Sequence, residues 1–200
     1  MRWEERARSV CGIAVLLIAL GAVDRVIASS ELQALLDEAV ATSYRSPVEA
    51  RRLDAELRVL LQDSPDARIE AGTYLNDCRS LIEEDGEKAL VAALAGREVL
   101  ALSPDPVIQL RLDLCEYAAR EYLGQSSESM TGYDRSVDQA ETLGVPSLQA
   151  EARLARGELR GYLGRYGDAL EDMQFACRRY DELGLKDESL TCLQAIAVLY

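Results

Sequence analysis

Apolar and polar residues alternate with a helical period along most of the chain. Leucine, alanine and other apolar residues recur at steps of three and four, which places them along one side of a helix with 3.6 residues per turn. The two-residue alternation of a half-buried strand is missing, so the pattern predicts an all-α protein. The expected helices are 31–44, 47–62, 66–84, 87–102, 106–123, 127–143, two within 147–185, and a ninth that begins at Asp187.

Short landmarks recur at an interval of roughly 40 residues or at twice that interval, a spacing typical of helical repeat arrays. The recurring segments are 122–124 and 162–164 (Tyr-Leu-Gly), 143–144 and 183–184 (Leu-Gly), 89–90 and 169–170 (Ala-Leu), and 64–66 and 103–105 (Ser-Pro-Asp). Glycine at the end of a helix adopts the left-handed conformation without steric cost, so Gly164 and Gly184 are expected to terminate helices. A single helical hairpin cannot bury its apolar side, and stacked repeats bury it together. The sequence therefore predicts a solenoid of antiparallel helix hairpins.

The hairpin within 147–185 resembles a tetratricopeptide repeat. The matching positions are three small residues (Gly157, Ala169 and Ala176) and the turn and start of the second helix (Gly164, Tyr166 and Leu170). We interpret the small residues as the places where helices approach each other closely. The chain departs from that family at Arg153 and Arg160, where large apolar or aromatic residues are usual. Its period is also longer than the family's usual period of about 34 residues. The resemblance implies a right-handed superhelical solenoid over residues 29–200.

The same resemblance implies a binding surface for protein. In such arrays the first helix of each hairpin lines a concave groove that accepts a peptide or a partner helix. The equivalent positions here are Tyr74, Arg111, Leu114, Tyr122, Glu151, Leu154, Glu158 and Tyr162. Tyrosine offers a large contact area and a polar tip, which suits recognition. The alternative is that Tyr122 and Tyr162 pack between hairpins as structural aromatic residues.

Residues 1–28 have the order of a secretory signal. Arg2, Arg6 and Arg8 precede an apolar run from Val10 to Val23, and small residues follow at Ala28. The run is shorter than the roughly 20 residues that span a bilayer. We expect cleavage after Ala28 and an exported, periplasmic protein. A cut after Ser30 is the next choice. An uncleaved anchor and a buried first helix are the alternatives to a cleaved signal.

Composition narrows the chemistry. The formal net charge is −13, which disfavours nucleic acid and anionic lipid as partners. The sequence has no histidine, which removes the usual catalytic triads and most zinc sites. We therefore expect no catalysis, no cofactor and no metal within residues 1–200.

Four cysteines follow the signal segment, at positions 78, 115, 177 and 192. They form no C-x-x-C pair. Cysteines on apolar stripes are usually buried free thiols, and that is the expectation here. A disulfide between Cys177 and Cys192, which flank the turn at Gly184, is the alternative in an exported protein.

The last expected helix carries an open apolar stripe at Leu193, Ile196, Ala197 and Tyr200. An array seldom ends in this way, so we interpret the chain as truncated in mid-repeat. An export signal followed by repeats of this period resembles the amino-terminal region of membrane-anchored diguanylate cyclases of the GGDEF type. That resemblance implies an input module whose enzyme domain is absent from this chain. The alternative is a stand-alone envelope scaffold.

Overall fold

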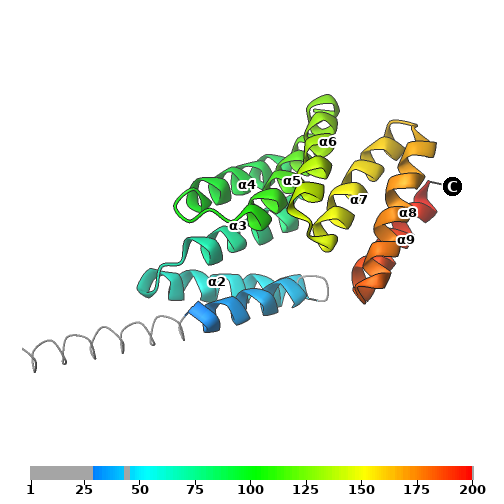
Figure 1. Cartoon of the computed structure of the whole chain (residues 1–200). Coiled ribbons are helices and arrows are strands. Elements are labelled where there is room, and N and C mark those ends of the chain that lie inside the picture. The colour runs from blue at the N-terminus through cyan, green and yellow to red at the C-terminus, as the bar shows by residue number, and fades with distance from the viewer. Residues whose placement is uncertain (1–28, 43–45, 200) are drawn as a thin grey trace, which may run out of the picture. The chain divides into compact units, whose positions relative to one another are not determined.

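The computed structural model describes residues 29–42 and 46–199, and the predicted signal segment lies outside them. Within these ranges the chain is all α-helical (Figure 1). The helices are 29–42, α2 (Pro47–Asp63), α3 (Ala67–Leu81), α4 (Gly86–Leu100), α5 (Pro106–Tyr122), α6 (Ser126–Leu143), α7 (Pro146–Tyr162), α8 (Tyr166–Glu182) and α9 (Lys186–Val198). None of the described helices is long and apolar enough to cross a membrane. The all-α prediction is confirmed.

The chain divides into two compact units, up to Glu70 and from Ala71 onward. In the first unit, Leu32 and Leu36 of the helix over 29–42 pack with Leu57 and Leu61 of α2 and with Ile69. In the second unit, each helix from α4 to α8 packs against the next, and α5 also contacts α7. The second unit thus repeats the hairpin that the sequence predicts, as α5 with α6 and as α7 with α8.

Glycine ends the helices at regular intervals. Gly124, Gly144, Gly164 and Gly184 all have positive φ angles, between 65° and 79°. Behind Gly164, the backbone N–H of Arg165 donates to the carbonyl of Arg160 at 2.8 Å, which closes the helix end. The predicted terminators at 164 and 184 are confirmed.

Aspartate begins helices at the two Ser-Pro-Asp landmarks. The Asp66 side chain accepts hydrogen bonds from the backbone N–H of Arg68 and Ile69. The Asp105 side chain accepts from Val107 and Ile108 at 2.9 and 3.1 Å. A carboxylate in this position satisfies backbone donors that the first turn leaves unpaired. The recurrence of Ser-Pro-Asp is therefore a recurrence of the helix start.

Two predicted helices end earlier than expected. The helix predicted over 66–84 ends at Leu81, and the one predicted over 87–102 ends at Leu100. After Leu81 the chain must turn so that Asp85 can accept a hydrogen bond from the N–H of Lys88 and start α4. The predicted bounds had included Glu83 and Glu84 of this acidic turn in the helix.

The small residues of the α7–α8 hairpin lie where the two helices touch. A Cβ on Gly157 would stand 3.0 Å from the Met173 Cγ and 3.1 Å from the Ala169 carbonyl oxygen. Ala169 and Ala176 have no exposed surface, and Ala176 packs with Cys192 of α9. Leu170 is half-buried, whereas Tyr166 at the start of α8 is exposed.

The cysteines are paired, contrary to the expectation of free thiols. Cys78 of α3 bonds to Cys115 of α5, and Cys177 of α8 bonds to Cys192 of α9. The second pair is the alternative that the sequence had suggested. The first was not anticipated, because its partners lie 37 residues apart on the first helices of successive hairpins. All four cysteines are buried, as expected, but they are buried as pairs.

Candidate binding surface

A single carboxylate joins three first helices. The Nε of Arg111 (α5) donates to the Oε2 of Glu151 (α7) at 3.2 Å. Arg79 (α3) donates to the other oxygen of the same carboxylate. We call the side of α3, α5 and α7 that carries these three residues the first-helix face. Arg111 and Glu151 were predicted to share it, and Arg79 was not found from the sequence.

Two exposed tyrosines lie on the same face. Tyr122 follows Arg111 by eleven residues and Tyr162 follows Glu151 by eleven, which is three helical turns and returns to the same side. The side chains of Tyr122 and Tyr162 are 58% and 79% exposed. Residues that pack between hairpins would be covered. This exposure favours a role in binding over purely structural packing.

Three predicted contact residues are less available. Leu114 is 6% exposed and belongs to a core cluster with Leu110, Tyr133 and Leu148. Leu154 is half-buried and packs against the cluster around Cys177 and Cys192. The Cβ of Tyr74 approaches Gly96 of α4, so the base of that side chain packs within its own hairpin. Their apolar atoms are used for packing and leave little surface for a ligand.

Carboxylates gather near the end of α5 and α7. The hydroxyl of Tyr133, a buried residue of α6, donates to the Glu121 Oε2 at 3.2 Å. Desolvation raises the pKa of Glu121. Desolvation and, second, the charge of Glu121 raise the pKa of Glu158 to about 7. Glu158 is nevertheless an exposed residue overall.

The charges of α4 and α5 are organised around a buried glutamate. Glu116 of α5 is buried and accepts hydrogen bonds from Arg97 of α4 and from Arg120, the latter at 2.9 Å. Arg97 also pairs with Asp113 at 3.4 Å. Two arginines thus compensate one buried carboxylate, as a buried charge requires.

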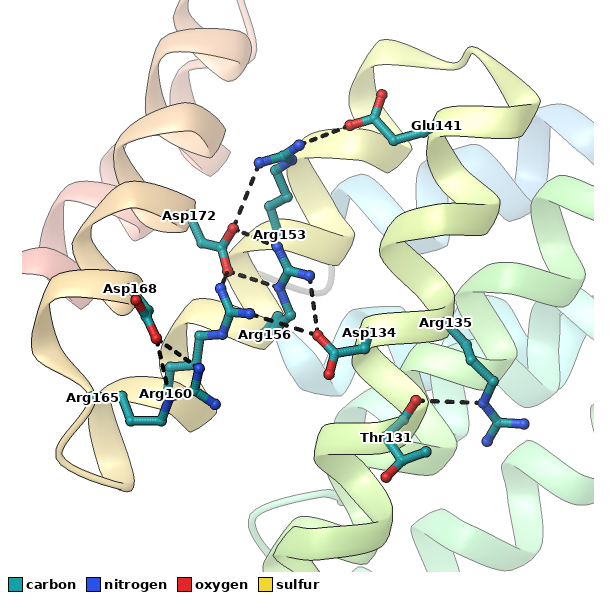
Figure 2. A network of polar contacts seen from close by, with 10 residues as sticks. All are labelled: Thr131, Asp134, Arg135, Glu141, Arg153, Arg156, Arg160, Arg165, Asp168 and Asp172. Carbon is teal, nitrogen blue, oxygen red and sulfur yellow. Dashed lines mark hydrogen bonds and ion pairs between the residues drawn. The ribbon is translucent and has the colours of Figure 1, made fainter.

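A second network surrounds Asp172 of α8 (Figure 2). Asp172 is 2% exposed. It accepts two hydrogen bonds of 2.8 Å from Arg156 and one of 2.6 Å from Arg160. Arg153 pairs with Glu141 of α6, and Arg156 also reaches Asp134 of α6 at 3.1 Å. Figure 2 shows the three arginines extending from α7 between α6 and α8.

This network explains the two departures from the tetratricopeptide pattern. Arg153 and Arg160 stand where that family has large apolar residues, and here both take part in the polar contacts around Asp172. Arg153 also lies over the Phe175 ring at 4.2 Å, a cation–π contact. The sequence signal was present as three arginines at steps of three and four on one side of α7.

No group of three or more possible metal ligands is found among the described residues.

Comparison with known proteins supports the fold. No family model matches the chain, and no curated protein matches it. Among solved structures, the chain is similar to a STAND protein (signal transduction ATPase with numerous domains) with a tetratricopeptide repeat sensor from Pyrococcus horikoshii, with a TM-score of 0.58 and 16% identity. The alignment covers 84% of this chain and 27% of that protein. At this identity the likeness shows a tetratricopeptide-like repeat fold, and the chain spans about a quarter of its counterpart's length.

Proposed function

We propose that the chain is a protein-binding repeat module that acts as the input region of a larger signalling protein, with its partner on the first-helix face. The observation that carries the proposal is the exposure of Tyr122 and Tyr162 at equivalent positions of α5 and α7. Large aromatic side chains left in solvent on neighbouring helices provide the anchors that protein interfaces use. The likeness to a protein that bears a repeat sensor supports the signalling role.

The proposal extends to the finer expectations from the sequence. The hairpins stack as a right-handed superhelix, the chain itself performs no catalysis, and residues 1–28 direct export. Two buried disulfides suit an oxidising compartment such as the periplasm. The output domain of the parent protein would be a diguanylate cyclase, on the resemblance given above. A stand-alone envelope scaffold is the second candidate, and the coding sequence after Tyr200 separates the two.

The test measures binding and stability on the same variants. Peptides selected on the purified chain from a random display library serve as ligands, and their affinities are measured by fluorescence anisotropy. Replacing Tyr122 and Tyr162 together by alanine should weaken binding by about 2 kcal/mol. The melting temperature should stay close to that of the parent, because both side chains are exposed.

The matched control is Tyr166→Ala. Tyr166 is 57% exposed, like Tyr122, but lies at the start of the second helix α8. The Tyr166→Ala variant should therefore bind the peptides with unchanged affinity. Equal binding by the parent and the double variant would refute the proposal. A double variant that melts much earlier, and whose folded fraction binds normally, would show that the tyrosines serve packing.

A further inference from the structure

Two glutamates on the same side of α7 differ in their partners. Glu151 is bonded by Arg79 and Arg111 of the two neighbouring first helices. Glu158 follows it by seven residues, two helical turns further along the same side. Among the described residues, nothing forms a hydrogen bond or ion pair with Glu158. The first-helix face therefore has one neutralised carboxylate and one without a counter-ion.

The groups around Glu158 add negative charge. After burial, the charge of Glu121 of α5 is the second cause that raises the pKa of Glu158. Burial and then the charges of Glu83, Glu121 and Glu158 raise the pKa of Tyr122. Burial and then Glu121 and Glu158 raise the pKa of Tyr133. These neighbours are carboxylates and tyrosines, with no arginine or lysine acting on Glu158 within the described part of the chain. Like charges held together in this way oppose ionisation, and a cation from outside would relieve the repulsion.

The exposed tyrosines supply the remaining requirement for a docking surface. An aromatic ring contacts the alkyl stem of a lysine or arginine and attracts its charge. Tyr162 follows Glu158 by one helical turn, and Tyr122 is adjacent to Glu121. On these grounds, and resting on the function proposed above, we propose that the partner segment docks a lysine or arginine side chain beside Tyr122 and Tyr162, onto the carboxylates of Glu121 and Glu158.

Charge complementarity decides which kind of partner side chain fits beside Glu121 and Glu158. An acidic side chain would meet the negative charges of Glu83, Glu121 and Glu158, and an apolar one would leave Glu158 without a counter-ion. A basic side chain forms charge-assisted hydrogen bonds, which are roughly twice as strong as neutral ones. The partner is thus a peptide or protein segment with a basic residue at its centre.

The experiment uses four pools of nine-residue labelled peptides with blocked termini and no histidine. The central residue is lysine, arginine, leucine or glutamate, and the other positions are randomised over uncharged residues. Anisotropy is measured on the full chain at pH 8. The lysine and arginine pools should bind roughly tenfold more tightly than the leucine and glutamate pools, as expected for a charge-assisted contact.

Two charge variants assign the effect to its residue. Glu158→Gln should lower the affinity for the lysine pool to that for the leucine pool. Glu171→Gln, which removes the same charge from an exposed position of α8, should change nothing. Affinity of the parent for the lysine pool should rise as the pH increases through about 7, where Glu158 ionises, and this rise should vanish in Glu158→Gln. The peptides carry no group that titrates in this range.

Stability provides the internal check on folding. The pKa of Glu158 is higher in the folded chain than its ordinary value, so the folded state holds this proton more tightly than the unfolded state. Stability is then lost as the pH rises through about 7. Glu158→Gln should therefore melt higher than the parent at pH 8.5, and its weaker binding cannot come from unfolding.

The two proposals fail differently. Equal binding of all four pools, with Glu158→Gln like the parent, overturns the basic-residue proposal. If that uniform binding is still weakened by the double tyrosine variant, the function proposed above stands. Absence of binding by every pool overturns both.

Discussion

The hairpins α5–α6 and α7–α8 have first helices with equivalent bounds but differ in the residues that lie between their two helices. Their first helices begin at Pro106 and Pro146 and end at Tyr122 and Tyr162, so both bounds are one repeat period apart. Where the helices cross, however, the bulky and the small residue change places. In α5–α6 the Tyr117 ring fills the space above Gly132, whereas at the equivalent positions of α7–α8, Gly157 faces Asp172.

The charges of the two first helices also differ, at two of three equivalent positions. Positions 113, 116 and 120 of α5 are Asp, Glu and Arg, and the equivalent positions 153, 156 and 160 of α7 are all arginine. The partner on the preceding helix changes with them, from Arg97 of α4 to Asp134 of α6. Each helix thus carries the sign that its own neighbour requires.

The comparison shows that complementarity is kept where residue identity is not. A hairpin needs one large and one small residue at its crossing, and a buried carboxylate needs cations, but either helix can supply either member. As a consequence, each hairpin fits only its own position in the array. In the place of α5, α7 would set its arginines against Arg97, and like charges would oppose the pairing.

The first way to break this comparison is to remove Asp172. Its arginines Arg156 and Arg160 are themselves only 13% and 16% exposed in their side chains, so Asp172→Ala leaves buried positive charge without its main partner. The free energy of unfolding should fall by about 3–5 kcal/mol. Chemical denaturation followed by circular dichroism measures it.

Two controls grade the effect. Glu116→Ala should cost less than Asp172→Ala, because the side chains of Arg97 and Arg120 are 41% and 31% exposed and can return to water. Asp168→Ala removes a surface pair with Arg165 on the same hairpin and should cost about 0–1 kcal/mol. If the three variants unfold alike, the buried networks do not differ from surface pairs.

The second way is to cut the disulfides that tie the two hairpins to other helices. Cys78–Cys115 closes a separation of 37 residues and Cys177–Cys192 one of 15. The loss of chain entropy in the unfolded state predicts about 4 and about 3 kcal/mol respectively. Paired cysteine-to-alanine variants measure the two contributions by denaturation.

Alkylation tests the pairing itself. In the denatured parent without reductant, iodoacetamide should modify none of these four cysteines, and after reduction it should modify all four, as mass mapping of their peptides shows. Modification before reduction would restore the free-thiol expectation.

The helices were predictable because their signals are local. Glycine at 124, 144, 164 and 184 and aspartate at 66 and 105 act through their own backbone and the next few residues. The apolar stripe needs no knowledge of the partner that covers it. The start and end of most described helices therefore followed from the sequence.

The contacts between helices were not predictable in the same way. Asp172 borders an apolar stripe and resembles a solvated acid until the three arginines of α7 are known to face it. Leu114 was assigned to the binding surface by repeat equivalence, but the space opposite it is filled by Tyr133 and Leu148. Whether a residue is buried between helices depends on both helices. The sequence shows the apolar periodicity of each helix, but it does not show how two helices are rotated relative to each other.

The smallest expected effect distinguishes the two crossings by adding one methyl group. A Cβ on residue 132 would stand 2.5 Å from the Tyr117 ring, and one on residue 157 would stand 3.1 Å from the Ala169 carbonyl oxygen. Gly132→Ala should therefore destabilise the fold by about 1–3 kcal/mol through overpacking, and Gly157→Ala by less. Gly167→Ala meets no atom within 4 Å and should gain up to about 1 kcal/mol from helix propensity.

A double-mutant cycle assigns the clash to its hairpin. Tyr117→Ala removes the ring that the added methyl group at position 132 would meet, so Gly132→Ala should cost about 1 kcal/mol less in that background than in the parent. Tyr117→Ala and Gly157→Ala belong to different crossings, and their effects should add. Unfolding free energies from denaturant titration provide all the terms. The opposite result would be coupling between Tyr117 and residue 157 together with additivity at residue 132. It would mean that the Tyr117 ring packs against the next hairpin. The exchange of large and small residues between the two crossings would then be refuted.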